Sequence, residues 1–203
     1  VGGIRPKKLG YTSIDQRPSG FAVMRSGWDP KDLYMIVNYG PWGGGHAHND
    51  LLDFAMYAHG APVTVESNRW GSYDNPLDSF FRSPQAHNQV VVNDTPMDRS
   101  KHRGEHAVWA SGKGLDYFSA SHEAYRDKFG VTIERSFVFL KPDYFLVSDT
   151  VTEDHRHSSY TWYLHAPSKW RAGKSRSVTT SKPGLQVIPA KPQEIRHVRQ
   201  GTS

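Results

Sequence analysis

Val131-Thr-Ile-Glu-Arg-Ser-Phe-Val-Phe139, written VTIERSFVF, alternates two sets of side chains along its length. The first set is Val131, Ile133, Arg135, Phe137 and Phe139, and the second set is the residues between them. A period of two places each set on one face of an extended strand. The β-branched and aromatic side chains of this stretch favour the same conformation. The stretch therefore predicts a strand with one face turned toward a core.

Other segments on both sides of this strand carry the same signature. Tyr144–Val151 and Ser159–Leu164 are aromatic and β-branched, as strands prefer. Gln89–Val92 is typical of a buried strand, and the turn signal Asn93-Asp-Thr-Pro96 follows it directly. Strands are thus predicted before and after the central stretch.

The N-terminal third adds further strands. Phe21–Arg25 and Leu33–Val37 flank the turn-forming Trp28-Asp-Pro30. Asp50–Ala58 also has helical spacing, but its neighbours favour a strand, paired through His59-Gly-Ala-Pro62 with Val63–Val65. We count about ten strand candidates at short spacing, no convincing long helix and no internal repeat. The sequence predicts an all-β fold, a large antiparallel β-sandwich.

Composition supports one folded unit. The chain has 203 residues, of which 36% are hydrophobic and 12% aromatic, enough for a proper core. We expect a single domain over residues 1–203. Val1–Pro18 and Arg171–Ser203 are poorer in apolar residues, and we expect 171–203 to be a weakly ordered or edge segment. Cysteine is absent, which excludes disulfides and thiolate chemistry and leaves the compartment open.

Charge narrows the class of partner. The formal net charge is +5 and the sequence pI is about 9.4, which favours anionic partners such as an acidic polysaccharide. Nucleic acid is not expected as a partner, because no recognised binding motif or basic stripe is present. A membrane is not expected either, because no apolar stretch is long enough to span one. The opening Val-Gly-Gly-Ile-Arg-Pro lacks a signal peptide and looks processed or truncated.

The segment Gly43-Gly-Gly-His-Ala-His-Asn-Asp50 carries the most distinctive chemistry. On an extended backbone His46 and His48 would project from the same face. Glu66 ends the next expected strand and His87 precedes another, so imidazoles and a carboxylate from neighbouring strands make a plausible zinc set. From the residues alone, metal ligation, proton transfer and a hydrogen-bonded polar strand face all remain open.

A series of short motifs follows this segment in order. They are Gly45-His-Ala-His-Asn-Asp-Leu-Leu-Asp-Phe54, Tyr57-Ala-His-Gly-Ala-Pro62, Val65-Glu66, Ser72-Tyr-Asp74 and Phe81-Arg-Ser-Pro-Gln-Ala-His-Asn88. The series resembles the β-sandwich portion of the heparinase II/III-like polysaccharide lyases, which include the oligoalginate lyases. The resemblance covers about Phe21 to Leu164.

The resemblance implies roles for five of these residues. His48, Glu66 and His87 match the positions of the family's zinc ligands, and the zinc is expected to be structural. The family usually has aspartate where this chain has Glu66. His46 matches a histidine at the active cleft and is the best catalytic candidate. Tyr73 resembles a cleft tyrosine of some members, although its hydroxyl could instead cap a β-edge.

The resemblance also implies contacts with an acidic substrate. Arg82 resembles an arginine that faces the substrate, although it could instead pair with Asp78 or Asp74 on the surface. The further candidates for substrate binding are Asn88, Trp42 and His165.

The function implied is cleavage of a uronate-containing polysaccharide by β-elimination, with His and Tyr in acid–base roles. An N-terminal helical toroid is also implied, so we expect this chain to be the C-terminal part of a longer enzyme that is periplasmic or secreted. Two alternatives remain open: a non-catalytic carbohydrate-binding sandwich, and a zinc-dependent hydrolase. Hydrolysis would form no double bond, and a binding module would cleave nothing.

Overall fold

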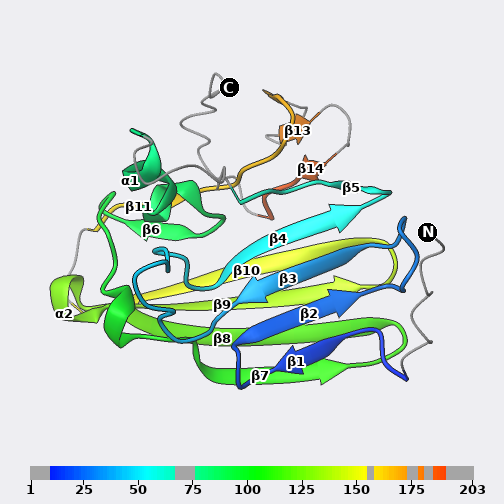
Figure 1. Ribbon diagram of the computed structural model, residues 1–203, viewed down its shortest axis with the longest axis horizontal. Coiled ribbons are helices and arrows are strands. Elements are labelled where there is room, and N and C mark those ends of the chain that lie inside the picture. Colours follow the sequence, from blue (N-terminus) through cyan, green and yellow to red (C-terminus); the bar gives the residue numbers. More distant parts are fainter. Residues whose placement is uncertain (1–9, 67–75, 155–157, 173–177, 181–184, 191–203) are drawn as a thin grey trace.

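The computed structural model describes residues 10–66, 76–154, 158–172, 178–180 and 185–190. Two antiparallel sheets form its body (Figure 1). The first sheet has the order β1 (Ile14–Gln16), β2 (Phe21–Arg25), β3 (Tyr34–Asn38), β4 (Asp53–Ala58) and β5 (Ala61–Pro62). The second has the order β10 (Tyr144–Glu153), β9 (Val131–Leu140), β8 (Leu115–Tyr125) and β7 (Glu105–Ser111).

Two smaller sheets complete the strands. β11 (Tyr160–Trp162) pairs with β6 (Val90–Val92). β12 (Trp170–Ala172), β13 (Val178–Thr180) and β14 (Gln186–Val187) form a three-stranded antiparallel sheet. Parts of the 171–203 segment thus form strands, residues 185 and 188–190 are described without strand structure, and residues 173–177, 181–184 and 191–203 lie outside those described.

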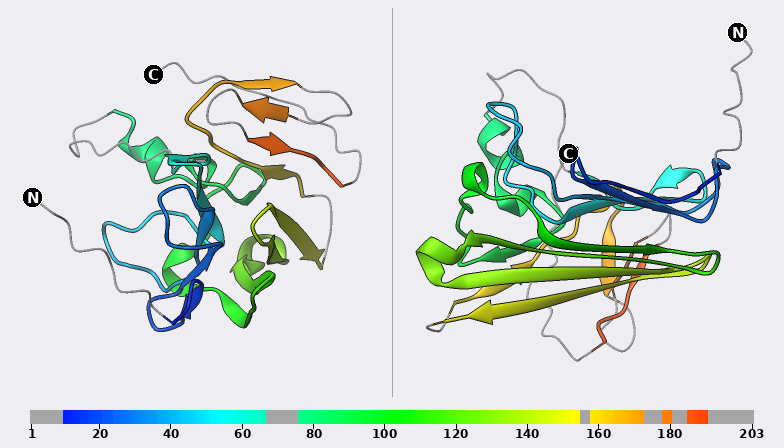
Figure 2. Two further views of the ribbon diagram at one scale, coloured as in Figure 1. Left: turned by 90° about the vertical axis from the view of Figure 1, so that its right-hand side faces the viewer. Right: turned by 90° about the horizontal axis from the view of Figure 1, so that it is seen from below.

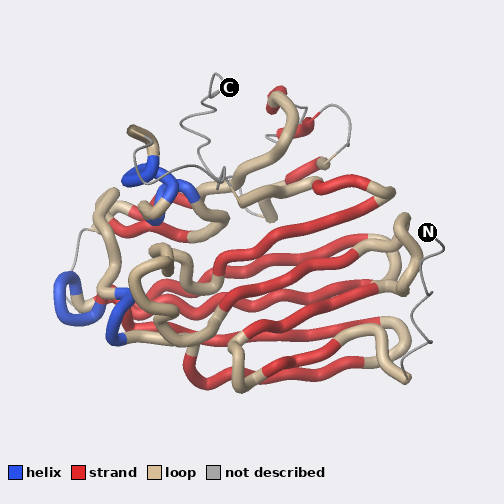
Figure 3. The backbone as a smooth tube through the Cα atoms, in the orientation of Figure 1, coloured by secondary structure: helices blue, strands red, loops and turns tan. Residues whose placement is uncertain are grey.

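The helices are single turns gathered at one end of the main sheets (Figure 3). They are α1 (Asp78–Phe81), η1 (Pro84–Ala86), η2 (Arg99–Lys101) and α2 (Arg126–Phe129). Gly130, with φ of 66°, ends α2 in the left-handed conformation that suits glycine. In the described part of the chain, no helix is both long and apolar enough to cross a membrane.

The two main sheets pack face to face, as the alternation in β9 predicts (Figure 2). The core between them contains the buried side chains Ala22, Met24, Met35, Val37, Phe54, Phe118, Ala120, Phe137 and Phe139. A second cluster continues the core under β6, with Leu51, Val90, Val92, Met97, Ala124, Tyr125, Val131 and Ile133. The predicted antiparallel β-sandwich is therefore confirmed.

The hairpin after β4 differs from the prediction in its returning strand. The turn lies at His59 and Gly60, both with positive φ, as expected for a tight hairpin. The returning strand is only Ala61–Pro62 instead of Val63–Val65. Its ladder ends there because Met56 O accepts from the backbone nitrogens of both Val63 and Thr64. The chain then leaves β4, and Val65 N donates to His165 O across the end of the sandwich.

Candidate functional site

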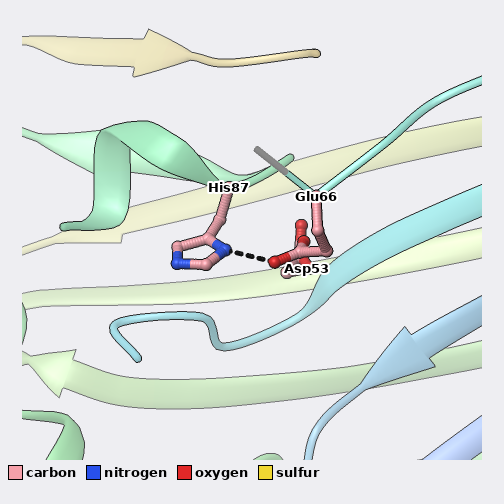
Figure 4. Close-up of side chains that lie close together, drawn as sticks. All are labelled: Asp53, Glu66 and His87. Atoms are coloured by element: carbon pink, nitrogen blue, oxygen red, sulfur yellow. Dashed lines mark hydrogen bonds and ion pairs between the residues drawn. The ribbon is translucent and has the colours of Figure 1, made fainter. Parts of the chain in front are cut away.

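Asp53, Glu66 and His87 come together at the end of the sandwich where the helices gather (Figure 4). Each offers one ligand atom, and the three atoms lie within 4.8 Å of one another. Asp53 is the first residue of β4, Glu66 follows the short strand β5, and His87 directly follows η1. Three separate segments therefore contribute one polar side chain each to the same small volume.

His87 is held by the turn before it. Pro84 begins η1, where its fixed φ suits a helical turn and its missing N–H is not needed. The turn ends as His87 adopts an extended conformation, with φ of −119° and ψ of 159°. The imidazole is fully buried, and its Nδ1 lies 2.6 Å from Glu66 Oε2. The ring orientation is thus fixed by the Glu66 carboxylate.

Asp53 is buried on the face of β4 opposite the core. The next residue, Phe54, packs in the core, so the alternation of the strand turns the Asp53 side chain the other way. There its Oδ1 accepts a 2.5 Å hydrogen bond from Asn88 N. Burial, and then the hydrogen bond and negative charge of Glu66, raise the pKa of Asp53 well above its usual value. Burial also raises the pKa of Glu66.

The cluster fits a divalent metal ion. Among the described residues, the buried atoms His87 Nε2 and Glu66 Oε1 have no hydrogen-bond partner. Buried polar atoms are rarely left unpaired, and coordination of a cation is one way to satisfy them. One imidazole and two carboxylates are ligands that zinc accepts, and three protein ligands leave a fourth position. Calcium would require more oxygen ligands.

His46 and His48 lie in a loop between β3 and β4, so the expectation of two histidines on one strand face is wrong. Gly44 has φ of 86°, and Ala47 N donates to Gly44 O, so the backbone turns at this point. His46 is exposed. His48 is half-buried, with its ring centroid 5.3 Å from that of His87. Burial and the neighbouring His87 and Arg82 lower the pKa of His48.

Asp53 joins the cluster as a residue that the sequence analysis did not name as a metal ligand. Of the three predicted metal ligands, Glu66 and His87 belong to the cluster, and His48 lies beside it. A signal for Asp53 was present in the sequence. It is the one charged residue in the otherwise apolar stretch Leu51–Ala58, where the alternation leaves it on the face away from the core.

Arg82 braces the histidine loop. Its Nε lies 2.9 Å from Asp78 Oδ2, so the predicted surface pair with Asp78 is present. Its Nη1 donates to Gly45 O at 2.7 Å, one residue before His46. Its own carbonyl accepts from the backbone and side-chain nitrogens of Asn49. Arg82 therefore fixes the loop that carries both histidines.

Asn88 has a structural position, contrary to the expectation of a substrate contact. Its side chain is fully buried, and Nδ2 donates to Phe54 O and Val65 O. Its Oδ1 accepts from His165 N at 2.6 Å. All these contacts are internal, so the amide joins three backbone segments and presents no group to a substrate.

The remaining predicted residues are less closely connected to the cluster. His165 lies beyond the end of β11, and its Nε2 is 2.9 Å from Gln85 O, so the ring belongs to the wall around His87. Burial lowers the pKa of His165. Trp42 is half-buried in the loop after β3. Tyr73 lies outside the described residues.

Comparison with known proteins agrees with this fold. The family described as heparinase II/III-like, C-terminal, matches residues 10–201. The chain belongs to this family. A search of curated proteins finds no match.

Solved structures share the fold. The heparan sulfate lyase HepC from Pedobacter heparinus matches with a TM-score of 0.74 and 24% identity, over 86% of this chain and 28% of that chain. The heparinase III BT4657 gene product matches with a TM-score of 0.74 and 20% identity, over 85% of this chain and 27% of that chain. The present chain thus spans little more than a quarter of the length of these proteins.

Proposed function

We propose that this chain is the β-sandwich part of a lyase that cleaves a uronate-containing polysaccharide by β-elimination. Membership of the heparinase II/III-like family supports the reaction class. One observation supports placing the reaction at this site: His46 is exposed on a loop that Arg82 holds in place. This loop lies next to the buried Asp53–Glu66–His87 cluster. The net charge of +5 suits an anionic polymer.

In this reaction a base removes the proton at C5 of the uronate, next to its carboxylate. The electron pair left on C5 forms a double bond to C4, and the C4–O bond breaks. An acid then protonates the departing oxygen. We assign His46 to the proton transfer at C5, because an imidazole nitrogen can accept a proton and this ring is exposed on a braced loop. Tyr73, the other catalytic candidate of the sequence, is proposed to protonate the departing oxygen.

The proposal includes a structural zinc ion held by Asp53, Glu66 and His87. Bound there, zinc would supply a fixed positive charge that joins the three segments. The protein's own contribution is to orient the ligands: Glu66 orients the imidazole, and Asn88 N orients the Asp53 carboxylate. His48, adjacent to His87, is the candidate for the fourth position. Proton transfer is assigned to His46 on the exposed loop and not to the zinc site.

Two further elements of the proposal follow from the family and the polymer substrate. A helical N-terminal domain would supply the other wall of the cleft. A polymer substrate also places the enzyme outside the cytoplasm, in the periplasm or secreted. Detection of the natural protein in periplasmic or extracellular fractions, and not in the cytoplasm, tests that placement.

The test uses the natural protein that carries this chain, incubated with heparan sulfate and separately with alginate. Elimination yields an unsaturated uronide that absorbs in the ultraviolet, and His46→Ala should abolish its formation. His59→Ala, an exposed histidine in the β4–β5 turn, serves as the matched control. New reducing ends without ultraviolet absorbance, lost on chelation, would indicate a zinc hydrolase instead. Polymer binding without any cleavage would indicate a binding module.

A further inference from the structure

We propose that Arg135 is the positioning residue that sets the spacing of the three candidate metal ligands from within the core. The inference rests on the proposed metal site, and it assigns a role to a residue that lies outside that site. Arg135 is on β9, in the sheet opposite β4, and it is 1% exposed. The alternation of β9 predicts an inward-facing position, where a charged side chain is unusual.

The charge of Arg135 is balanced by one partner. Its Nε lies 2.6 Å from Asp149 Oδ1 and its Nη2 lies 3.0 Å from Asp149 Oδ2, which is a bidentate pair across the β9–β10 ladder. A buried guanidinium is tolerated only when such a pair and further hydrogen bonds replace its hydration. The bidentate geometry also fixes the plane of the guanidinium.

The remaining contacts of Arg135 reach the segments that carry the ligands. Its Nη1 donates to Leu52 O at 3.0 Å and to Asn88 O at 2.8 Å. Leu52 immediately precedes Asp53, and Asn88 immediately follows His87. Arg135 Nη1 therefore connects the backbone segments next to Asp53 and His87, two candidate ligands that are far apart in the sequence.

Asn88 extends this brace to the third ligand. Its Nδ2 donates to Val65 O, and Val65 immediately precedes Glu66. Its backbone nitrogen donates to the Asp53 carboxylate itself. The connections from Arg135, directly and through Asn88, thus reach all three ligand segments. No other arginine in the described part of the chain donates to both Leu52 and Asn88.

The backbone at Leu52 explains why a firm anchor is needed there. Leu52 has φ of 57°, a left-handed conformation that is unfavourable for a residue with a side chain. It is held in this conformation by burial of its side chain, by donation from Leu52 N to Asn38 O, and by the Arg135 bond at its carbonyl. Relaxation at Leu52 would move Asp53 away from Glu66 and His87.

Two substitutions test the brace. Arg135→Lys keeps the charge but loses the planar fork, so it cannot hold Asp149 and both carbonyls together. Asp149→Asn keeps the arginine but removes the anion that fixes its plane. The matched control is Lys141→Gln, since Lys141 forms another buried ion pair, 2.7 Å from Asp116 Oδ1, without touching the ligand segments. Zinc affinity is measured by calorimetry, and the absorption spectrum of bound Co²⁺ reports ligand geometry.

We expect Arg135→Lys to weaken zinc binding roughly 10–100-fold and to change the Co²⁺ spectrum, as loss of outer supporting residues does at other sites. Asp149→Asn should produce a smaller change in the same direction. Lys141→Gln should lower the melting temperature with unchanged zinc affinity and spectrum. If Arg135→Lys does not fold, the zinc affinity and the Co²⁺ spectrum of Asp149→Asn test the proposal.

The outcomes separate the two proposals. Wild-type protein that binds no zinc overturns the metal site of the proposed function. Wild-type protein that binds zinc, with folded variants whose affinity and Co²⁺ spectrum equal the wild type, overturns the brace alone. A loss of affinity in Lys141→Gln equal to that in Arg135→Lys also overturns it, because a general loss of stability would then explain both.

Discussion

His87 Nδ1 lies 2.6 Å from Glu66 Oε2, while Nε2 on the other side of the same buried ring has no hydrogen-bond partner in the described part of the chain. A carboxylate at one ring nitrogen fixes the tautomer and leaves the other nitrogen as an electron-pair donor. The relationship prepares His87 to act as a metal ligand. It also gives Glu66 two ways to act, as a direct ligand or as the group that orients the imidazole.

The first prediction separates the ligand set from its neighbour His48. Asp53→Asn should lower zinc content from about one ion per chain to a small fraction, because the amide keeps the shape but loses the anionic donor. His48→Ala should lower the zinc content less than Asp53→Asn does, since His48 lies beside the cluster and is the candidate for the fourth position only. Metal analysis of the purified proteins checks both. Loss of zinc in His48→Ala with retention in Asp53→Asn would reverse the assignment.

The second prediction concerns pH and the metal. The pKa of Asp53 is raised, so the folded metal-free protein keeps a proton that the unfolded chain releases near pH 4. The contribution of Asp53 to the stability of the metal-free protein should therefore fall as pH rises from about 4 toward the raised pKa, while the buried His122 contributes a change of opposite sign at the lower pH values. Zinc replaces the proton, so zinc affinity should increase over the same range. Melting curves with and without zinc, from pH 4 to 8, measure both trends.

The contribution of Asp53 to this pH dependence has its own control. Asp53→Asn removes the titrating group, so the melting temperature of the metal-free wild type, measured relative to that of Asp53→Asn, should fall as pH rises over this interval. A difference between the two melting temperatures that does not fall with pH in the absence of metal would contradict the raised pKa.

The third prediction concerns acid stability. His122 is buried among charged neighbours, and burial, followed by the charge of Arg135, lowers its pKa to about 3. The unfolded chain binds the proton near pH 6.5, so stability is lost as pH falls below that value, by about 1.4 kcal/mol per pH unit for this group. His122→Asn retains an acceptor for Ala124 N and should reduce the loss between pH 7 and 5. Denaturant titrations at both values provide the comparison.

The fourth prediction concerns the histidine loop. Arg82→Ala removes the bond to Gly45 O, so His46 should lose its fixed position and elimination should slow by at least tenfold. Stability should change by less than about 1 kcal/mol, because the Arg82–Asp78 pair is partly exposed. Arg126→Ala removes a similar surface pair, with Asp154, and is the control. Equal rates in both variants would exclude a positioning role for Arg82.

The sandwich was predictable because its strands carry their signal locally. The alternation in β9 and the apolar run of β6 each require only neighbouring residues to be interpreted, and both proved to be strands. The end of the hairpin at Pro62 was not predictable. It depends on Met56 O, which accepts from both Val63 and Thr64, and on the contact of Val65 with His165.

The candidate site was predictable in part. The motifs identified Glu66 and His87, because their order along the chain resembles that of the family. They also suggested that His46 and His48 share a strand face, which the turn at Gly44 prevents. The sequence predicts that Asn88 is a polar site residue. Its burial and its hydrogen bonds to three internal backbone partners, which only the structure shows, indicate a structural role.

The sequence by itself determined the fold class, the positions of strands such as β9 and β6 and the residue types available for chemistry, because periodicity and side-chain type are local properties. The tertiary structure alone decided which polar groups meet. Asp53, Glu66 and His87 come from segments joined only through the packing of two sheets. Arg135 reaches two of those segments from the opposite sheet. A sequence specifies such contacts only through the whole fold, since the energy of a buried charge depends on partners distant along the chain.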